Sequence, residues 1–304
     1  MTRVLMAAAS VAAATLMLAV PARADILYVG NQGNNTIAKF TSGGVGTTFT
    51  ATAINSPRGL AFDGAGNLYV ANIGNNTIER FAPNGTASVF ASTGLNQPTG
   101  LAFDKAGNLY VANVGSSTIE KFTPGGVGSV FASTGLSNPY GLAFDGAGNL
   151  YAANATFSVS TVAKFTPAGV GSVFASGFSG PVGLAFDSAG NLFVGNISNS
   201  TIEKITPNGT RSIFASTGLS VLYGLAFDSA DNLYVGNSGN NTIRKFTPAG
   251  VASVFANTGL NSPEFLAFTN DAGVPLALPV PELSSWAMFG LGISALAWAR
   301  RRRC

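Results

Sequence analysis

One β-rich unit is written six times between Ile26 and Leu278. Its most recognisable segment, Leu-Tyr-Val-x-Asn or a close variant, starts at Leu27, Leu68, Leu109, Leu150, Leu192 and Leu233. The successive steps are 41, 41, 41, 42 and 41 residues. Each unit offers four short β-rich runs separated by Gly, Asn, Pro or Asp, which is typical of strands joined by turns. Four strands in a repeat of this length form a propeller blade, so the sequence predicts an all-β, six-bladed β-propeller.

The ends of the repeat predict how the ring closes. The first unit begins at its second strand, Ile26 to Gly30, and lacks the Gly-Leu-Ala-Phe strand that opens every later unit. The run Phe265 to Thr269 supplies that strand near the end of the repeat. We therefore expect the N- and C-terminal strands to share one composite blade beside five complete blades. Strand alternation puts Leu60 and Phe62 on one face and Ala61 on the other, so a bulky face should meet a small-residue face of the next blade.

Charge and residue usage exclude several classes of function. Ten basic and twelve acidic residues lie between Asp25 and Pro281, a formal charge of −2, while the other six basic residues lie near the two ends. This region lacks the clustered Lys and Arg that bind nucleic acid. Histidine is absent, and the one cysteine, Cys304, is the last residue. The repeat region therefore has no disulfide, no thiolate and none of the commonest general base.

The first 24 residues have the order of a secretory signal peptide. Arg3 precedes an apolar run from Val4 to Val20, and small residues follow, with Ala22 and Ala24 in an A-x-A pattern. We expect signal peptidase to cleave after Ala24, so that the propeller spans residues 25–279. A transmembrane helix is the alternative, and the A-x-A pattern just before the first strand argues against it.

The last 25 residues have a different order. Val280-Pro281-Glu282 precedes an apolar stretch of 14 residues from Trp286 to Ala299, or 17 counted from Leu283. Seventeen residues are the short limit for a helix that crosses a bilayer. Four arginines follow the stretch: Arg300, Arg301, Arg302 and Arg303. They should stay cytoplasmic by the positive-inside bias, with the propeller outside. A permanent tail anchor is the simpler alternative.

This C-terminal order resembles the PEP-CTERM sorting signal of Gram-negative bacteria, with Leu283 in place of the second proline. The resemblance implies recognition by an exosortase at residues 280–304 and cleavage near Pro281-Glu282. The protein would then be exported through the inner membrane, held there transiently by the C-terminal helix, and released to the cell surface or the extracellular matrix.

The motif from Pro57 to Asn72, Pro-Arg-Gly-Leu-Ala-Phe-Asp-Gly-Ala-Gly-Asn-Leu-Tyr-Val-Ala-Asn, resembles the NHL repeat and the gluconolactonase-like propellers. The likeness covers nearly the whole middle of the chain and implies a scaffold that many activities share. Gluconolactonase-like enzymes hold a divalent metal with acidic and amide groups in the channel. Streptogramin lyases share the scaffold but rely on histidine, which this chain lacks.

The Asp-x-x-Gly-Asn turns, such as Asp63 to Asn67, allow two interpretations. Carboxylate and amide oxygens lie close together in such turns, as a calcium ion requires. One carboxylate per turn is too few for an ion that takes six to eight oxygens, so we expect hairpins with Asx hydrogen bonds and a glycine at positive φ. We predict no metal and no cofactor, with a divalent cation such as calcium as the unsupported alternative.

A six-fold set of asparagines ends the second strand of each unit: Asn31, Asn72, Asn113, Asn154, Asn196 and Asn237. The NHL pattern often has Asp at this position, so charge is exchanged for neutral donors and acceptors. Hydrogen bonding to the following turn is one explanation. Contact with a ligand, chiefly through Asn72, Asn113 and Asn154, is the other.

A more variable position precedes the first strand motif of each unit. It holds Arg58, Thr99, Tyr140, Val182, Tyr223 and Glu264. Because the first strand of a blade is innermost, these residues should ring one mouth of the central channel, on the same face as the asparagines. Charged groups and tyrosines among amides suit a sugar or a polar peptide. Drift without function is the competing explanation.

The segment from Asn154 to Thr161 carries two more residues than its counterpart from Asn113 to Thr118. We expect this insertion to bring Phe157 and Val159 to the same face, where loop insertions often contact partners. Taken together, the sequence predicts an exported, non-enzymatic binding or structural propeller whose ligand is an envelope or matrix glycan or protein. A metal-dependent, gluconolactonase-like hydrolase is the alternative.

Overall fold

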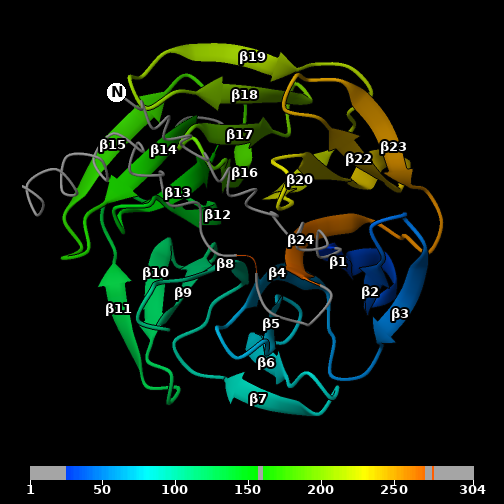
Figure 1. Cartoon of the computed structure of the whole chain (residues 1–304). Helices are drawn as coiled ribbons and strands as arrows, with labels where there is room; N and C mark the ends of the chain where they lie inside the picture. Colours follow the sequence, from blue (N-terminus) through cyan, green and yellow to red (C-terminus); the bar gives the residue numbers. More distant parts are fainter. Residues whose placement is uncertain (1–24, 157–159, 271–275, 277–304) are drawn as a thin grey trace, which may run out of the picture.

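The computed structural model describes residues 25–156, 160–270 and 276, and these residues form a ring of six four-stranded antiparallel sheets (Figure 1). The fold prediction is confirmed. The predicted signal peptide, the predicted sorting signal, and Phe157 and Val159 of the predicted insertion lie outside the described residues. Within the described ranges, no helix is long and apolar enough to cross a bilayer.

Each blade runs from an innermost strand to an outer one, and its strands are consecutive in the chain except in the composite blade. The composite blade contains β24 (Pro263–Asn270), β1 (Asp25–Asn31), β2 (Thr36–Phe40) and β3 (Gly46–Thr50). The second blade contains β4 (Pro57–Phe62), β5 (Leu68–Asn72), β6 (Thr77–Phe81) and β7 (Ala87–Ala91). The third contains β8 (Pro98–Phe103), β9 (Leu109–Asn113), β10 (Thr118–Phe122) and β11 (Gly128–Ala132).

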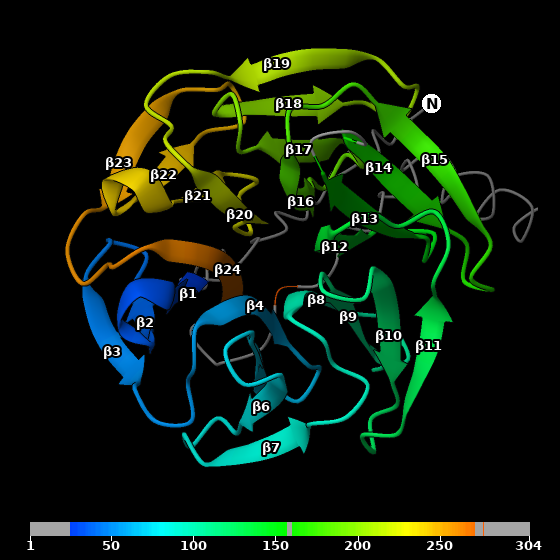
Figure 2. The ribbon, with the colours of Figure 1, turned by 180° about the vertical axis from the view of Figure 1, so that it is seen from behind.

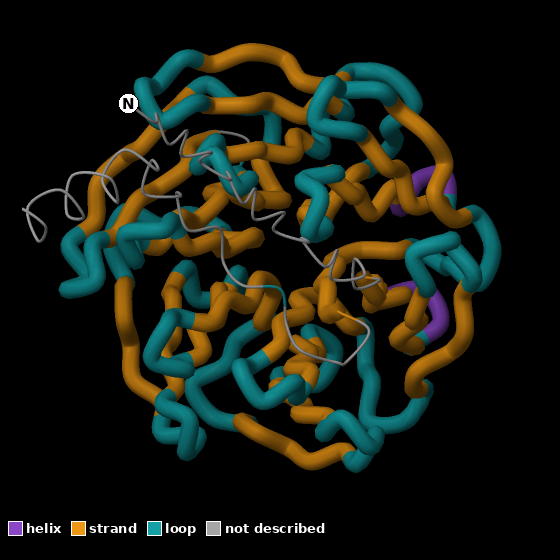
Figure 3. Tube along the Cα trace, in the orientation of Figure 1, coloured by secondary structure: helices purple, strands orange, loops and turns teal. Residues whose placement is uncertain are grey.

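The remaining blades repeat this arrangement. The fourth contains β12 (Pro139–Phe144), β13 (Leu150–Ala155), β14 (Ser160–Phe165) and β15 (Gly171–Ser176). The fifth contains β16 (Pro181–Phe186), β17 (Leu192–Asn196), β18 (Thr201–Ile205) and β19 (Arg211–Ala215). The sixth contains β20 (Leu222–Phe227), β21 (Leu233–Asn237), β22 (Thr242–Phe246) and β23 (Ala252–Ala256). Two short 3-10 turns, η1 (Gln32–Asn34) and η2 (Ser238–Asn240), are purple in Figure 3.

The composite blade closes the ring as predicted. β1 pairs antiparallel with β24, with Asp25 opposite Asn270 and Val29 opposite Leu266. In Figure 1 these two strands, blue and orange, lie side by side although they come from the two ends of the repeat. Closure therefore depends on a pairing between residues more than two hundred positions apart.

Aromatic contacts join each blade to the next. The Tyr69 ring meets Phe90 of its own blade and Phe103 of the following blade edge-on, with ring centroids 4.9 and 5.0 Å apart. Equivalent pairs recur in every blade, with Phe193 in the tyrosine's place in the fifth. Leu60 and Phe62 pack with Tyr28 of the preceding blade, whereas Ala61 packs with the following blade. The expected meeting of bulky and small faces is confirmed.

Glycines let the innermost strands approach one another closely. A Cβ atom at Gly59 would lie 2.1 Å from the carbonyl oxygen of Thr99, and one at Gly141 would lie 2.3 Å from that of Val182. Any side chain at these positions would collide with the backbone of the next blade. The composite blade has Phe265 at the corresponding position, so the ring departs from its repeat there.

The innermost strands carry residues from one end of the channel to the other. Pro57 lies opposite Asn72 at one end of β4, and Phe62 lies opposite Leu68 at the other. The asparagines and the variable residues therefore share one end, as predicted, and the Asp turns lie at the opposite end. Figure 2 turns the ring over, so the two views look onto opposite faces. We call the first end the Arg58 mouth and the second the funnel.

Candidate functional site

The Arg58 mouth contains an ion pair that links β4 to the composite blade. Arg58 Nη1 lies 2.5 Å from Glu264 Oε2. The Gln32 amide completes the arrangement: it donates to Glu264 Oε1 at 3.0 Å and accepts from Arg58 Nη2 at 3.1 Å. The guanidinium also lies over the Tyr223 ring, 5.1 Å from its centroid, in a cation–π contact. Two of the predicted mouth residues are thus in direct contact, and Tyr223 joins them.

Burial governs the electrostatics of this cluster. Glu264 is 1% exposed, and burial raises its pKa to about 7, while the attraction of Arg58 opposes that rise. Burial by itself lowers the pKa of Arg58, but Glu264 and Tyr223 together raise it, so Arg58 stays cationic. Burial also raises the pKa of the Tyr140 hydroxyl, against the pull of Arg58. The Glu264 carboxyl group therefore takes up a proton close to neutral pH.

Stability alone does not account for this cluster. A buried ion pair is often no more stabilising than apolar residues of the same size. Arg58 Nε is buried without a partner among the described residues, and such an unsatisfied donor costs about 1–3 kcal/mol. In the third and fifth units the same position holds Thr99 and Val182, which are buried packing residues. The cluster is therefore the strongest candidate for a functional group at this end of the channel.

Two predicted mouth residues, Thr99 and Val182, are buried and stabilise the packing of the ring. Thr99 is fully buried, and its hydroxyl donates to the carbonyl oxygens of Ala112 at 3.2 Å and Pro139 at 3.1 Å. Val182 is buried in the cluster that includes Leu222. Tyr140 and Tyr223 are half-buried and pack against that same cluster. The tyrosines and Arg58 thus remain as the candidate residues for contact with a ligand, and the buried Glu264 pairs with Arg58 behind them.

The asparagine side chains hold loops between blades. Asn72 Oδ1 accepts from the backbone N–H of Asn55 at 3.1 Å, and its Nδ2 donates to the Ala53 carbonyl oxygen at 2.9 Å and to Thr77 Oγ1 at 3.3 Å. Asn113 and Asn154 make equivalent bonds, and all three are at most 1% exposed. This geometry favours the turn-bonding explanation for the asparagines over contact with a ligand.

The Asp turns are self-contained hydrogen-bonded units. Asp63 Oδ1 accepts from the backbone N–H groups of Ala65 and Asn67, both at 2.9 Å, and Oδ2 accepts from Asn67 Nδ2 at 2.7 Å. In later blades a lysine lies near the same carboxylate, as Lys121 does 3.9 Å from Asp104. Gly66 has φ +82° in this turn, a value that glycine adopts readily. These contacts favour the structural interpretation of the turns.

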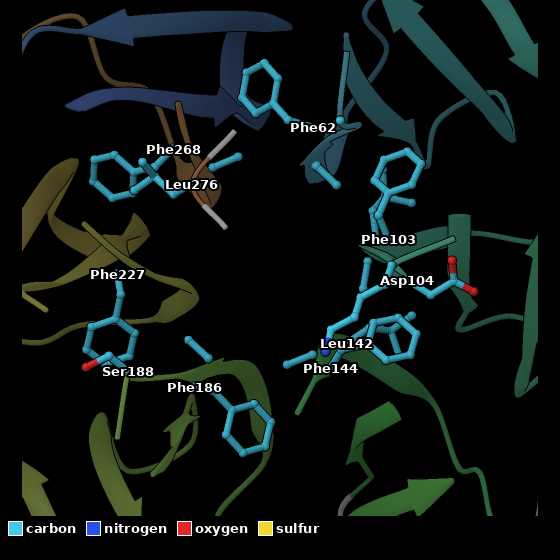
Figure 4. Close-up of a pocket in the computed structure, with 18 of the residues that line it drawn as sticks. Phe62, Phe103, Asp104, Leu142, Phe144, Phe186, Ser188, Phe227, Phe268 and Leu276 are labelled. Atoms are coloured by element: carbon cyan, nitrogen blue, oxygen red, sulfur yellow. The ribbon is translucent and has the colours of Figure 1, made fainter. Parts of the chain in front are cut away.

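Gln32 and the funnel were not singled out in the sequence. The signal for Gln32 is weak: it follows Asn31, where the next two units have Ile73 and Val114. The funnel is a cavity of about 790 Å³. Its wall contains one phenylalanine from each innermost strand: Phe62, Phe103, Phe144, Phe186, Phe227 and Phe268 (Figure 4). Because these residues repeat in every unit, the sequence presents them as scaffold.

Comparisons with known proteins agree with the fold. The NHL repeat family matches residues 95–122. No curated protein sequence matches the chain significantly. A chain of a nidogen/laminin complex is 21% identical, with a TM-score of 0.74, over 80% of this chain and 98% of that one.

Two enzymes share the architecture. A catalytically inactive virginiamycin B lyase from Staphylococcus aureus, solved with quinupristin, is 16% identical with a TM-score of 0.63, over 82% of this chain and 89% of that one. A gluconolactonase from Xanthomonas campestris is 18% identical with a TM-score of 0.63, over 70% and 82% of the two chains. At identities this low, the structural similarity shows the propeller fold alone, and that fold occurs in both binding proteins and enzymes.

Proposed function

We propose that this protein is an exported, non-enzymatic binding propeller that contacts an envelope or matrix glycan or protein through the Arg58 mouth. The observation that carries the proposal is the cluster of Arg58, Glu264, Gln32 and Tyr223. It is polar and specific to one side of a ring that otherwise repeats six-fold. Residues that differ from blade to blade at a mouth are what recognition requires of a repeat scaffold.

The chemistry of the mouth suits a hydroxyl-rich or polar ligand. Half-buried tyrosines offer ring faces for stacking and hydroxyl groups for hydrogen bonding. Arg58 and Gln32 add donors and acceptors that are held in fixed positions by their contacts with Glu264. A sugar ring, which presents both C–H and O–H groups, can use both kinds of contact.

The alternative is a metal-dependent hydrolase of the gluconolactonase type. Glu264 is the acidic residue among the six mouth positions, and its carboxylate is already paired with Arg58. Among the described residues, no three His, Cys, Asp or Glu side chains gather in a way that could hold a metal ion. The donor set at this mouth therefore supports binding over metal-assisted hydrolysis.

Export is part of the same proposal. The signal peptide pattern at residues 1–24 and the PEP-CTERM-like pattern at residues 280–304 support processing by signal peptidase and an exosortase. The inner membrane would hold the protein transiently before its release to the cell surface or matrix. Detection of a mature form that begins at Asp25 and lacks the arginine block would test both steps by mass spectrometry.

Glycan-array binding by the purified protein tests the function. We expect binding to a polysaccharide class that is lost when Tyr140→Ala and Tyr223→Ala are combined. Val130→Ala, on the exposed outer strand β11, serves as the control and should bind normally. Equal binding by all three proteins would defeat the assignment to this mouth. A stoichiometric divalent ion together with lactone hydrolysis would instead favour the enzyme.

A further inference from the structure

The funnel is an apolar cavity at the end of the channel opposite the Arg58 mouth. Alanines such as Ala185 and the ring of phenylalanines form its wall, and Asp104, Lys105 and Asp228 lie at its edge. About 790 Å³ is within the range of cavities that enclose small ligands or short peptide segments. An apolar wall of this extent suits an apolar occupant, because water gains few hydrogen bonds there.

The protein's own chain already enters this cavity. Leu276 lines the funnel and packs against the core cluster that contains Tyr234 and Phe268. Figure 4 draws its side chain near Phe268 at the edge of the open centre. Asn270 ends β24 at the same end of the ring, where it lies opposite Asp25. Six Cα steps separate Asn270 from Leu276 in the sequence, and six steps can span at most ~20 Å.

The sequence around Leu276 matches the cavity chemically. Residues 272–281 read Ala-Gly-Val-Pro-Leu-Ala-Leu-Pro-Val-Pro and carry no charge. Leu278 precedes Pro279, which favours an extended backbone at Leu278, and residues two apart on an extended chain point to the same side. Leu276 and Leu278 can therefore face one surface together. Burying a leucine side chain contributes roughly 1.5–3 kcal/mol.

We propose that the funnel is a binding site for a short apolar peptide and that its occupant is this chain's own segment from Leu276 to Pro279. Leu276 is the anchor, and Leu278 extends the contact across the phenylalanine ring. The assignment is independent of the proposed function, because it concerns the other end of the channel.

A peptide added in trans tests the proposal. In the full-length protein, Leu276→Asp combined with Leu278→Asp should release the segment from the apolar wall. A fluorescently labelled, end-blocked peptide Val-Pro-Leu-Ala-Leu-Pro should then bind this variant at least tenfold more tightly than the unchanged protein, measured by fluorescence anisotropy. Leu283→Asp, outside the segment, is the matched control and should leave peptide binding as it is in the unchanged protein.

A further substitution tests whether the peptide binds in the funnel. Adding Ala185→Arg to the double variant puts a long charged side chain into the funnel wall, and it should abolish peptide binding. Circular dichroism of each variant should match that of the unchanged protein, which checks that the variant is folded. Equal affinity of the peptide for the double variant and the unchanged protein, no measurable binding to either, or binding that survives Ala185→Arg would each overturn the proposal.

Discussion

The two ends of the channel are built from the same six strands in opposite ways. At the Arg58 mouth the second residue of each innermost strand differs from blade to blade, and two of these residues form a buried ion pair. At the funnel end the same alanine and phenylalanine positions repeat in all six blades. Arg58 and Phe62 are four residues apart on β4, or ~13 Å. One short strand therefore carries a specialised residue and a repeated one.

The comparison separates two ways in which a repeat protein can acquire a site. At the Arg58 mouth, a strand position that differs from blade to blade places charged groups at one side of the ring. At the funnel, the uniformity itself makes the site, because six identical contributions surround one apolar space. Irregular positions are thus a guide to recognition of polar ligands, whereas apolar sites arise from positions that look purely structural.

The largest effect should come from breaking the ion pair on one side. Arg58→Ala leaves Glu264 buried without its partner, which should lower the free energy of unfolding by about 3–5 kcal/mol near pH 8. Urea denaturation measures this loss. The double variant Arg58→Ala, Glu264→Gln should recover much of it, and a double variant as unstable as the single one would show that the pair is not coupled.

The pH dependence of the free energy of unfolding should report the titration of Glu264. Because the pKa of Glu264 is about 7 in the folded protein and ordinary when unfolded, protonation favours the folded state. The contribution is fully present below about pH 4.5 and is lost as the pH rises through 7, on the order of 3 kcal/mol. Denaturation of the unchanged protein and of Glu264→Gln across this range should give curves that diverge. Parallel curves would contradict the assignment.

The glycines of the innermost strands, between the Arg58 mouth and the funnel, should not accept a side chain without a loss of stability. Gly141→Ala places a Cβ atom 2.3 Å from the carbonyl oxygen of Val182, so the blades must move apart at a cost of about 1–3 kcal/mol. Gly64→Ala has nothing within 4 Å and is the matched control, with an expected change within about 0.5 kcal/mol. Thermal unfolding of the two variants would reveal whether close packing holds the ring.

A smaller effect should come from the asparagines behind the Arg58 mouth. Asn113→Ala removes the acceptor for the Asn96 N–H and the donor to the Gly94 carbonyl oxygen, at a cost of about 1 kcal/mol. Binding at the mouth should not change in glycan-array experiments if Asn113 only holds its loop. A loss of binding without a loss of stability would return Asn113 to the set of ligand contacts.

Much of the candidate site could be located from the sequence, but its partners could not. The register of the repeat correctly brings Arg58 and Glu264 to one end, since both occupy the same strand position in different blades. That they touch depends on ring closure, which makes the composite blade a neighbour of β4. Gln32 joins them because η1 follows β1 directly at that junction. Burial separates Thr99 and Val182 from the tyrosines, and strand position alone does not report burial.

The sequence by itself determined the blade, the number of blades and the composite closure, because alternation, turn residues and a constant period are local and repeat six times. Tertiary structure alone decided which variable residues meet, which asparagine atoms are used and where a cavity remains. Those outcomes depend on distances between blades. The close approach at Gly59 and its equivalents sets these distances, and together with ring closure they determine the ion pair at one end and the apolar funnel at the other.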